Sequence, residues 1–318
     1  MTTKSLGICV LGGTGFVGSE LVERLAEAGH TVRVPTRNLM HGNHLKVLPT
    51  LELVVANIHD GRMLAQLFTD MDVVVNLVGI LNERGRTTFR AVHVELAGKV
   101  VEAMRAARVT RLLHMSSLGA GAQAPSQYLR SKGEAEALIR VAAASLDATI
   151  FRPSVIFGPH DSLTNRFAHL LRLSGGVLPL ARPGARFAPV WICDVIEAFV
   201  RALNNRHTSG KSYELCGPDV MTLAELVRAT AAAAGLPCHL IPLPDFIAQL
   251  QALVMDFLPG KPFSWDNYKS LTIDSVCKQN GCAALGIEPA HMSATIAGYL
   301  TDHSVKSQLD AYRKSVID

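Results

Sequence analysis

A glycine-rich turn separates a strand-like apolar run, residues 6–11, from a helical pattern; its glycines are Gly12, Gly13, Gly15 and Gly18. The spacing is weak evidence alone, but a strand before it and a helix after it predict a phosphate-binding loop. Gly12 permits the tight turn, Gly15 lets the backbone approach a pyrophosphate, and Gly18 lets the helix pack closely. The helix N-terminus adds unpaired N–H groups and a positive dipole end. We therefore expect a dinucleotide here, with an empty glycine turn as the alternative.

The end of the second strand-like run indicates which ribose such a ligand carries. Folds selective for NAD place Asp or Glu there, about 20 residues after the glycines, to bind the 2′-hydroxyl. This chain has Pro35, Thr36, Arg37 and Asn38 instead. The Arg37 guanidinium can pair with a 2′-phosphate through two hydrogen bonds, whereas a solvated surface arginine is the alternative. We expect NADP(H) to be preferred, with NAD(H) possible.

Alternating strands and helices must position these residues. Strand-like runs fall at 6–11, 31–34, 51–55, 72–78, 111–115 and 148–151, and helical patterns at 15–28, 64–68, 89–107 and 128–144. Short apolar strands separated by helices predict a parallel sheet covered on both faces, the doubly wound α/β (Rossmann) fold. Proline and glycine become frequent after Pro153. We expect a dinucleotide-binding domain over 1–151 and a smaller, mostly helical C-terminal lobe over 152–318, with residues of about 185–216 returning to the sheet.

Composition excludes several classes of protein. The 318 residues are 48% hydrophobic, which excludes a disordered chain. A net charge of +4 with no block of Lys or Arg argues against nucleic acid as a partner. No apolar run reaches eighteen residues, so no transmembrane segment is expected, and no signal peptide precedes the first strand. Six dispersed cysteines predict a reduced, cytoplasmic protein with Cys216 as a buried free thiol, and no metal site is expected.

Several segments resemble the short-chain dehydrogenase/reductase superfamily: the glycine turn, residues 57–60 (Asn-Ile-His-Asp) and residues 128–132 (Tyr-Leu-Arg-Ser-Lys). Two more are similar to its extended or atypical branches, namely Arg152-Pro153 with Phe157-Gly158-Pro159, and residues 213–218. The stretch from Leu243 to Asn267, with Leu258-Pro259-Gly260, is similar to bacterial relatives of the nucleotide-binding accessory subunit of respiratory complex I. The superfamily resemblance covers nearly the whole chain.

The resemblance implies a catalytic set. Tyr128 matches the general acid/base, and Lys132 matches the lysine that lowers the phenol's pKa and holds the nicotinamide ribose. Their spacing places both on one helix face, and a phenol needs a neighbouring cation to work near neutral pH. Ser117, or Ser116 as the alternative, matches the serine that polarises the substrate oxygen. Only ten residues separate Ser117 from Tyr128, fewer than in sugar-nucleotide enzymes, which argues against an epimerase.

The resemblance also implies a cofactor-binding set, which is Gly12, Thr14, Gly15, Phe16, Val17, Gly18, Arg37, Asn38, Asn57, Ile58, Leu77, Val78, Gly79, Tyr128, Lys132, Pro153 and Val155. His93 stands where many relatives carry asparagine, and we interpret it as a packed histidine rather than a proton relay. Arg152 and Asp194 match family positions, where an ion pair and a substrate role are both open.

Two functions follow from these residues. The first is an NADP(H)-binding oxidoreductase acting on a small or hydrophobic carbonyl or alcohol, with a quinone-like ligand included. The second is a non-catalytic nucleotide-binding assembly or stability factor of a respiratory or quinone-related complex, peripheral to the inner membrane. Residues 246–258 form an apolar helical pattern, for which core or oligomer packing is expected and a hydrophobic substrate mouth or docking face is the alternative. The substrate and the oligomeric state are not specified by the sequence.

The first prediction concerns cofactor preference. NADP(H) should bind at least tenfold more tightly than NAD(H), because a charge-assisted contact from Arg37 contributes about 1.5–3 kcal/mol. Arg37→Ala should remove this difference. Titration of both cofactors against wild type and variant by intrinsic fluorescence measures it, and equal affinities in the wild type would refute the prediction.

Overall fold

The chain divides into two compact units. The computed structural model describes residues 5–142, 145–256 and 263–300. Unit 1 comprises Met1–Pro153, Cys193–Leu215 and Cys277–Glu288, and unit 2 comprises Ser154–Ile192, Cys216–Val276 and Pro289–Asp318. Two segments from late in the chain therefore belong to the unit built by the first 153 residues. The sequence analysis did not anticipate the second of them, Cys277–Glu288.

Unit 1 is built on a seven-stranded sheet in the order β11-β6-β5-β4-β1-β2-β3, and every neighbouring pair is parallel. The strands are β1 (Gly7–Leu11), β2 (Thr31–Thr36), β3 (Leu51–Val55), β4 (Val73–Asn76), β5 (Arg111–Met115), β6 (Asp147–Pro153) and β11 (Ser212–Leu215). The predicted doubly wound parallel sheet is confirmed. The chain reverses its direction of travel across the sheet between β1 and β4, where such folds bind ligands at the carboxyl ends of the strands.

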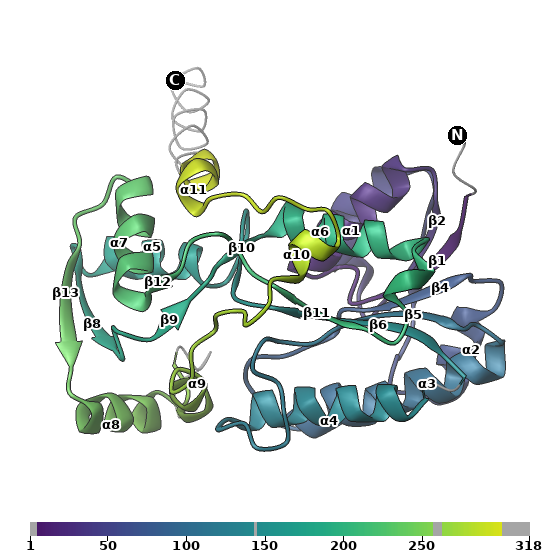
Figure 1. The fold of residues 1–318 in the computed structure, drawn as a ribbon, viewed down its shortest axis with the longest axis horizontal. Helices are drawn as coiled ribbons and strands as arrows, with labels where there is room; N and C mark the ends of the chain where they lie inside the picture. The colour runs from purple at the N-terminus through teal and green to yellow at the C-terminus, as the bar shows by residue number, and fades with distance from the viewer. Residues whose placement is uncertain (1–4, 143–144, 257–262, 301–318) are drawn as a thin grey trace, which may run out of the picture. The chain divides into compact units, whose positions relative to one another are not determined.

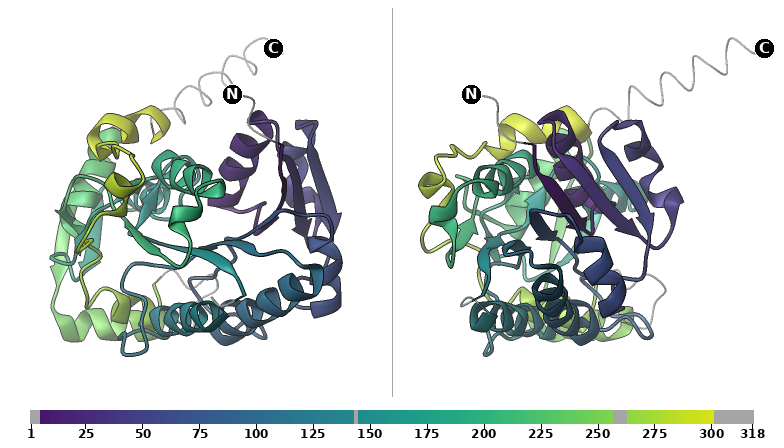
Figure 2. Two further views of the ribbon diagram at one scale, coloured as in Figure 1. Left: turned by 45° about the vertical axis from the view of Figure 1, so that its right-hand side comes forward. Right: turned by 90° about the vertical axis from the view of Figure 1, so that its right-hand side faces the viewer.

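Helices cover both faces of this sheet. Three lie on one face, namely α2 (Gly61–Phe68), α3 (Leu96–Ala107) and α4 (Gln127–Val141), while α1 (Phe16–Glu27) and α6 (Ile192–Leu203) lie on the other (Figures 1 and 2). Shorter elements are η1 (Leu39–Val47), η2 (Arg90–Glu95), η4 (Arg206–Thr208) and α10 (Gly281–Ala284). Burial on two faces explains why β4 and β5 consist entirely of buried residues.

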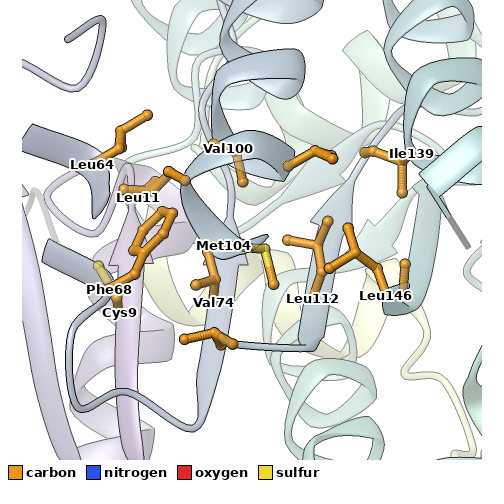
Figure 3. Packing of buried hydrophobic residues seen from close by; sticks show 14 of the residues in the cluster. Cys9, Leu11, Leu64, Phe68, Val74, Val100, Met104, Leu112, Ile139 and Leu146 are labelled. Atoms are coloured by element: carbon orange, nitrogen blue, oxygen red, sulfur yellow. The ribbon is translucent and has the colours of Figure 1, made fainter. Parts of the chain in front are cut away.

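The core of unit 1 fills the space between the sheet and helices α2–α4 (Figure 3). Cys9, Leu11, Val74 and Leu112 contribute from the strands, and the helices contribute the side chains of Leu64, Phe68, Val100, Met104 and Ile139. Burial of this apolar surface contributes about 25 cal/mol per Å² removed from water. It fixes the helices against the sheet, and therefore also the polar residues that the same helices carry.

Local signals set the helix ends. The Ser126 side chain accepts the Leu129 N–H and starts α4, and Asp60 accepts the N–H groups of Arg62 and Met63 at the start of α2. The predicted helix over 89–107 is corrected in one respect. Arg90–Glu95 is π-helical, and the α-helix begins only at Leu96. Such widened turns are rare and frequent at functional sites.

Unit 2 is mostly helical, as expected. Its helices are α5 (Thr164–Leu173), α7 (Leu223–Ala233), α8 (Asp245–Met255), α9 (Trp265–Ser270) and α11 (Met292–Leu300). Three two-stranded sheets pair β7 (Ile156–Phe157) with β10 (Val190–Trp191), β9 (Arg186–Phe187) with β12 (Met221–Thr222), and β8 (Val177–Ala181) with β13 (His239–Leu243). These short strands were not predicted, because proline and glycine obscure their pattern.

Helix α8 presents its large apolar side chains to solvent. Ala248 and Ala252 are buried against Ala181 and Tyr268, whereas Phe246 is 71% exposed. Its other exposed apolar side chains are Ile247, Leu250, Leu253 and Val254. The expectation that this segment packs into the core is therefore wrong for its large residues, because α8 meets unit 2 along its alanines. Residues 257 and 258, the end of the predicted segment, lie outside the described residues.

Cys9 and Cys238 are free thiols. Cys216 is disulfide-bonded, as is Cys277. The prediction of a free thiol at Cys216 is therefore wrong. Its apolar neighbours in the sequence indicated burial, which is correct, but contained no information about a partner. Across residues 5–142, 145–256 and 263–300, we find no helix with both the length and the apolarity that crossing a membrane requires.

Candidate functional site

The glycine turn after β1 is shaped by backbone contacts that leave no room for side chains. Gly12 has a φ of +82°, and its carbonyl oxygen accepts the N–H of Gly15 at 3.0 Å. A Cβ on Gly18 would stand 2.1 Å from the Gly12 oxygen, so α1 packs against this turn at a distance only glycine allows. Gly15 is exposed, and a Cβ there would meet only the Gly12 oxygen. At Gly15 the backbone of the turn is therefore exposed and no side chain covers it.

Helix α1 begins at this turn with its N–H groups uncapped. Gly15 is the N-cap, no side chain caps it, and the first turn contains no acidic residue. The first N–H groups of a helix have no partner within the helix and favour an anion. Val17 and Gly18 are buried, while Thr14 and Phe16 are half-buried. Val17 can therefore serve a ligand only through its backbone.

The segment after β2 places Arg37 in solvent beside other basic groups. Burial, and then the charges of Lys99 and Arg37, lower the pKa of His59. The Lys99 ammonium donates to the His59 carbonyl oxygen at 2.9 Å. Lys99 was missed by the sequence analysis, because its partner lies 40 residues earlier and no motif connects them. Arg37 and Lys99 form a positive region of unit 1 suited to a phosphate, beside an imidazole whose lowered pKa leaves it neutral.

Two of the predicted cofactor residues use their side chains locally. The Asn38 side chain accepts the Met40 N–H and starts η1, and Asn57 accepts the His59 N–H. Ile58 packs against the core of unit 1. These contacts hold the loops after β2 and β3 in place, so a ligand would meet the remaining amide nitrogens of the two asparagines.

The loop after β4 reaches the predicted catalytic lysine. The Leu77 N–H donates to the Leu11 carbonyl, and the Val78 N–H donates to the Asn76 side chain. A Cβ on Gly79 would stand 3.2 Å from the Lys132 Nζ. Glycine at position 79 therefore keeps the space in front of this amine open.

Ser117 and Tyr128 are joined by a side-chain hydrogen bond. Burial raises the pKa of the Tyr128 phenol, and the hydrogen bond with Ser117 opposes that rise. The alternative serine, Ser116, is buried, and among the described residues its hydroxyl has no hydrogen-bond partner. The geometry therefore favours Ser117 over Ser116 as the partner of the phenol.

Lys132 is 4% exposed and donates from Nζ to the Met115 carbonyl oxygen at 3.1 Å. Burial lowers the pKa of this amine to about 8, while the charge of Glu136 opposes the shift. The expected lowering of the Tyr128 pKa by Lys132 is absent here, because the ammonium is turned to a carbonyl and burial of the phenol dominates. The amine remains one helical turn from the phenol.

His93 is a structural residue. Its Nε2 accepts the Ile80 N–H at 3.1 Å, so the proton sits on Nδ1, which lies 2.8 Å from the Ser131 hydroxyl. Ser131 in turn donates to the Tyr128 carbonyl oxygen at 2.8 Å. Burial lowers the pKa of His93 to about 2, followed by the charge of Lys132. A neutral imidazole bonded at both nitrogens is the packed histidine that the sequence indicated, not a proton relay.

The remaining predicted positions lie in several parts of the fold. Arg152 is in an ion pair with the buried Glu136, which makes the ion-pair interpretation correct. Pro153 ends β6 and is buried, and Asp194 lies in the first turn of α6. Val155 belongs to unit 2, where its carbonyl accepts the Val190 N–H.

The residues of unit 1 fit a dinucleotide. The glycine turn is a cradle that a Cβ at Gly15 would fill, and an uncapped helix N-terminus faces it. The loop after β4 and the Ser117–Tyr128–Lys132 set follow the neighbouring strands β4 and β5 at the same edge of the sheet. This arrangement defines a class: a dinucleotide-binding Rossmann protein of the short-chain dehydrogenase/reductase kind.

Comparisons with known proteins agree. Residues 8–216 match the model of the NAD dependent epimerase/dehydratase family. The chain is 33% identical over 287 residues to NADH dehydrogenase [ubiquinone] 1 alpha subcomplex subunit 9, mitochondrial, of Arabidopsis thaliana, covering 85% of this chain and 71% of that protein. It is 30% identical to the ceramide reductase of Caulobacter vibrioides, covering 77% and 76%. The chain therefore belongs to the NAD dependent epimerase/dehydratase family.

Solved structures share the fold. The UDP-glucose 4-epimerase of Thermotoga maritima superposes with a TM-score of 0.73 at 18% identity, covering 96% of this chain and 100% of that one. At this identity the likeness establishes the fold alone. The predicted similarity to relatives of the complex I accessory subunit is confirmed by the curated proteins.

The second prediction tests the glycine turn. Gly15→Val should abolish NADPH binding while the sheet stays folded, because the side chain fills the open side of the turn. Isothermal titration measures the affinity, and circular dichroism checks the fold. Gly61→Val is the matched control, because a Cβ at Gly61 meets nothing within 4 Å. Unchanged affinity in Gly15→Val would place the nucleotide elsewhere.

Proposed function

We propose that this chain is an NADP(H)-dependent oxidoreductase that acts on a small or hydrophobic carbonyl or alcohol, quinone-like compounds included. The observation that carries the proposal is the hydrogen-bonded Ser117–Tyr128 pair, with Lys132 one helical turn away and the glycine turn on the same edge of the sheet. A protein that only bound nucleotide for stability would have no need of the serine–phenol pair.

The residues have separable roles in such a reaction. The bound cofactor supplies or accepts the hydride. Ser117 and Tyr128 hold the substrate oxygen by hydrogen bonds, and the Tyr128 hydroxyl gives it a proton during reduction or takes one during oxidation. Burial raises the phenol pKa, so Tyr128 is protonated at neutral pH and has a proton to give. Lys132 donates to the Met115 carbonyl in this structure, and it would stabilise the phenolate only after turning toward the phenol.

The preference for NADP(H) rests on the positive region after β2. Arg37 is exposed and free to reach a phosphate, and the ammonium of Lys99 adds to the positive potential around it. The second strand ends in Thr36 without a carboxylate, so the group that favours NAD in this fold is missing.

The names of two relatives support reductive chemistry. One is a ceramide reductase at 30% identity, and another is the NAD(P)H azoreductase of Xenophilus azovorans at 23%. The first name describes a hydrophobic substrate. The short connection between Ser117 and Tyr128 also argues against a sugar-nucleotide substrate.

The third prediction tests the chemistry. Tyr128→Phe removes the proton donor but keeps the ring, so turnover should fall about 10²-fold or more while NADPH affinity changes little. Lys132→Ala should reduce both. Oxidation of NADPH with a panel of quinones and small carbonyls measures turnover. Tyr213→Phe, in the edge strand β11, is the matched control. Wild-type turnover on the panel with an equally active Tyr128→Phe would contradict the mechanism.

A second function is favoured by a different observation. Helix α8 exposes Phe246, Leu250, Leu253 and Val254, a surface of the kind that proteins use for association. Several relatives are named as subunits of NADH dehydrogenase. We therefore propose as the alternative a nucleotide-binding subunit or assembly factor of a respiratory or quinone-related complex at the membrane, whose substrate chemistry has been lost.

The fourth prediction separates the two functions. Phe246→Ser with Leu250→Ser should abolish co-migration with the NADH dehydrogenase complex on native gels, while NADPH affinity stays at the wild-type value. Val141→Ser, an exposed valine of α4, is the control. Retained co-migration in the double variant, or none in the wild type, would count against the assembly role. The double variant could lose association while Tyr128→Phe is inactive but still associates. That combination would indicate that both functions exist.

A further inference from the structure

Glu136 is a carboxylate without any exposure to solvent. It lies on α4 one turn after Lys132, so the two side chains share a face of the helix. In an ion pair on the protein surface both side chains stay in water, where the pair costs little desolvation and contributes little to stability. Here the acidic partner is the buried one, while the side chains of Arg152 and Arg140 are 24% and 47% exposed.

Two guanidinium groups pair with the Glu136 carboxylate. Arg152 Nε donates to Oε1 at 2.7 Å, and Arg152 Nη2 donates to Oε2. Arg140 Nη2 donates to Oε2 at 2.7 Å and to the Ser212 hydroxyl at 3.0 Å. Hydrogen-bonded arginines offset the cost of taking a carboxylate out of water. Both carboxylate oxygens of Glu136 therefore have a cationic partner.

Within the part of the chain that the structure describes, Glu136 is the acidic group whose charge acts on Lys132. The phenol of Tyr128 is neutral, and burial keeps the nearby imidazoles His93 and His114 neutral by lowering their pKa values to about 2 and about 3. The Met115 carbonyl contributes only a dipole. Burial favours the uncharged amine of Lys132, and the charge of Glu136 is what opposes it.

We propose that Glu136 is a positioning residue: anchored by Arg152 and Arg140, and buried one helical turn from Lys132, it acts through Lys132 by keeping that amine charged. The role of Lys132 toward ribose and phenol rests on the proposed function, but its charge can be measured without any cofactor. Glu136 needs no contact with substrate. Its effect is electrostatic and extends over one helical turn.

The fifth prediction is a shift in the titration of Lys132. In cofactor-free protein the Nζ signal, followed by NMR and assigned with Lys132→Arg, should titrate near pH 8. Glu136→Gln keeps the shape but removes the charge, so the midpoint should fall by about one pH unit or more. Arg152→Gln should raise it, because the carboxylate is then less neutralised. Glu134→Gln, an exposed position on the same helix, should leave it unchanged.

NADPH affinity should change with pH in the same direction as the positive charge on Lys132. Wild-type NADPH affinity should fall as pH rises through the Lys132 midpoint, and Glu136→Gln should move that fall to lower pH by the same amount. An unchanged midpoint in folded Glu136→Gln would overturn the proposal. If Glu136→Gln does not fold, an unchanged midpoint in Arg152→Gln overturns it instead. A chain that binds no dinucleotide would refute the proposed function, while the cofactor-free titration would still decide the role of Glu136.

Discussion

Helix α1 meets the turn after β1 so closely that a Cβ on Gly18 would stand 2.1 Å from the Gly12 carbonyl oxygen. This close contact fixes where the helix begins. It directs the uncapped N–H groups of the helix toward the carboxyl ends of the neighbouring strands β1 and β4. The loops after β2 and β4 and the residues after β5 reach the same edge, because parallel strands end on one side of a sheet. Any change at Gly18 would move the helix and with it the backbone surface that we expect to receive a pyrophosphate.

Helix α4 carries the second half of the site along a single face. Tyr128, Ser131, Lys132 and Glu136 recur at spacings of three and four, and each contacts a different neighbour. The phenol bonds to Ser117, the hydroxyl to His93, the amine to Met115 and the carboxylate to Arg152. Buried polar groups are stable only when their hydrogen bonds are satisfied. In the described part of the chain, His114 and Ser116 are buried and their side-chain polar atoms have no hydrogen-bond partner.

The sequence predicted features that are encoded locally. Strands β3 and β5 have the predicted bounds, because short, mostly apolar runs between turns allow few alternatives. The glycine turn lies where its spacing placed it. Features that depend on distant contacts were missed: the π-helical turn before α3, the return of Cys277–Glu288 to unit 1, the disulfide bonding of Cys216, and the exposed face of α8. In α8 the hydrophobic periodicity was real, but periodicity does not specify which side of a helix meets the protein.

For the catalytic set, spacing located Tyr128 and Lys132 but could not give their electrostatics. A phenol and an amine four residues apart suggest a lowered phenol pKa, yet burial raises it in the folded chain. Glu136 was passed over because a Glu on a helix is ordinarily a solvated residue. Only the fold reveals that Arg152, sixteen residues later, buries that carboxylate and holds it.

The hydrogen bond from the Ile80 N–H to His93 influences which positions of the loop after β4 can be substituted. The segment from Ile80 to Phe89 is held at Ile80, whose N–H donates to the His93 imidazole. Within the segment, the Glu83 carboxylate accepts the Phe89 N–H at 2.7 Å. An imidazole can bridge the loop and Ser131 because its two nitrogens lie on opposite sides of a rigid ring. Between Glu83 and Phe89 the chain turns through Gly85, with Arg84 and Arg86 in solvent. Exchanges in this turn can therefore accumulate without breaking the contact between His93 and Ser131 of α4.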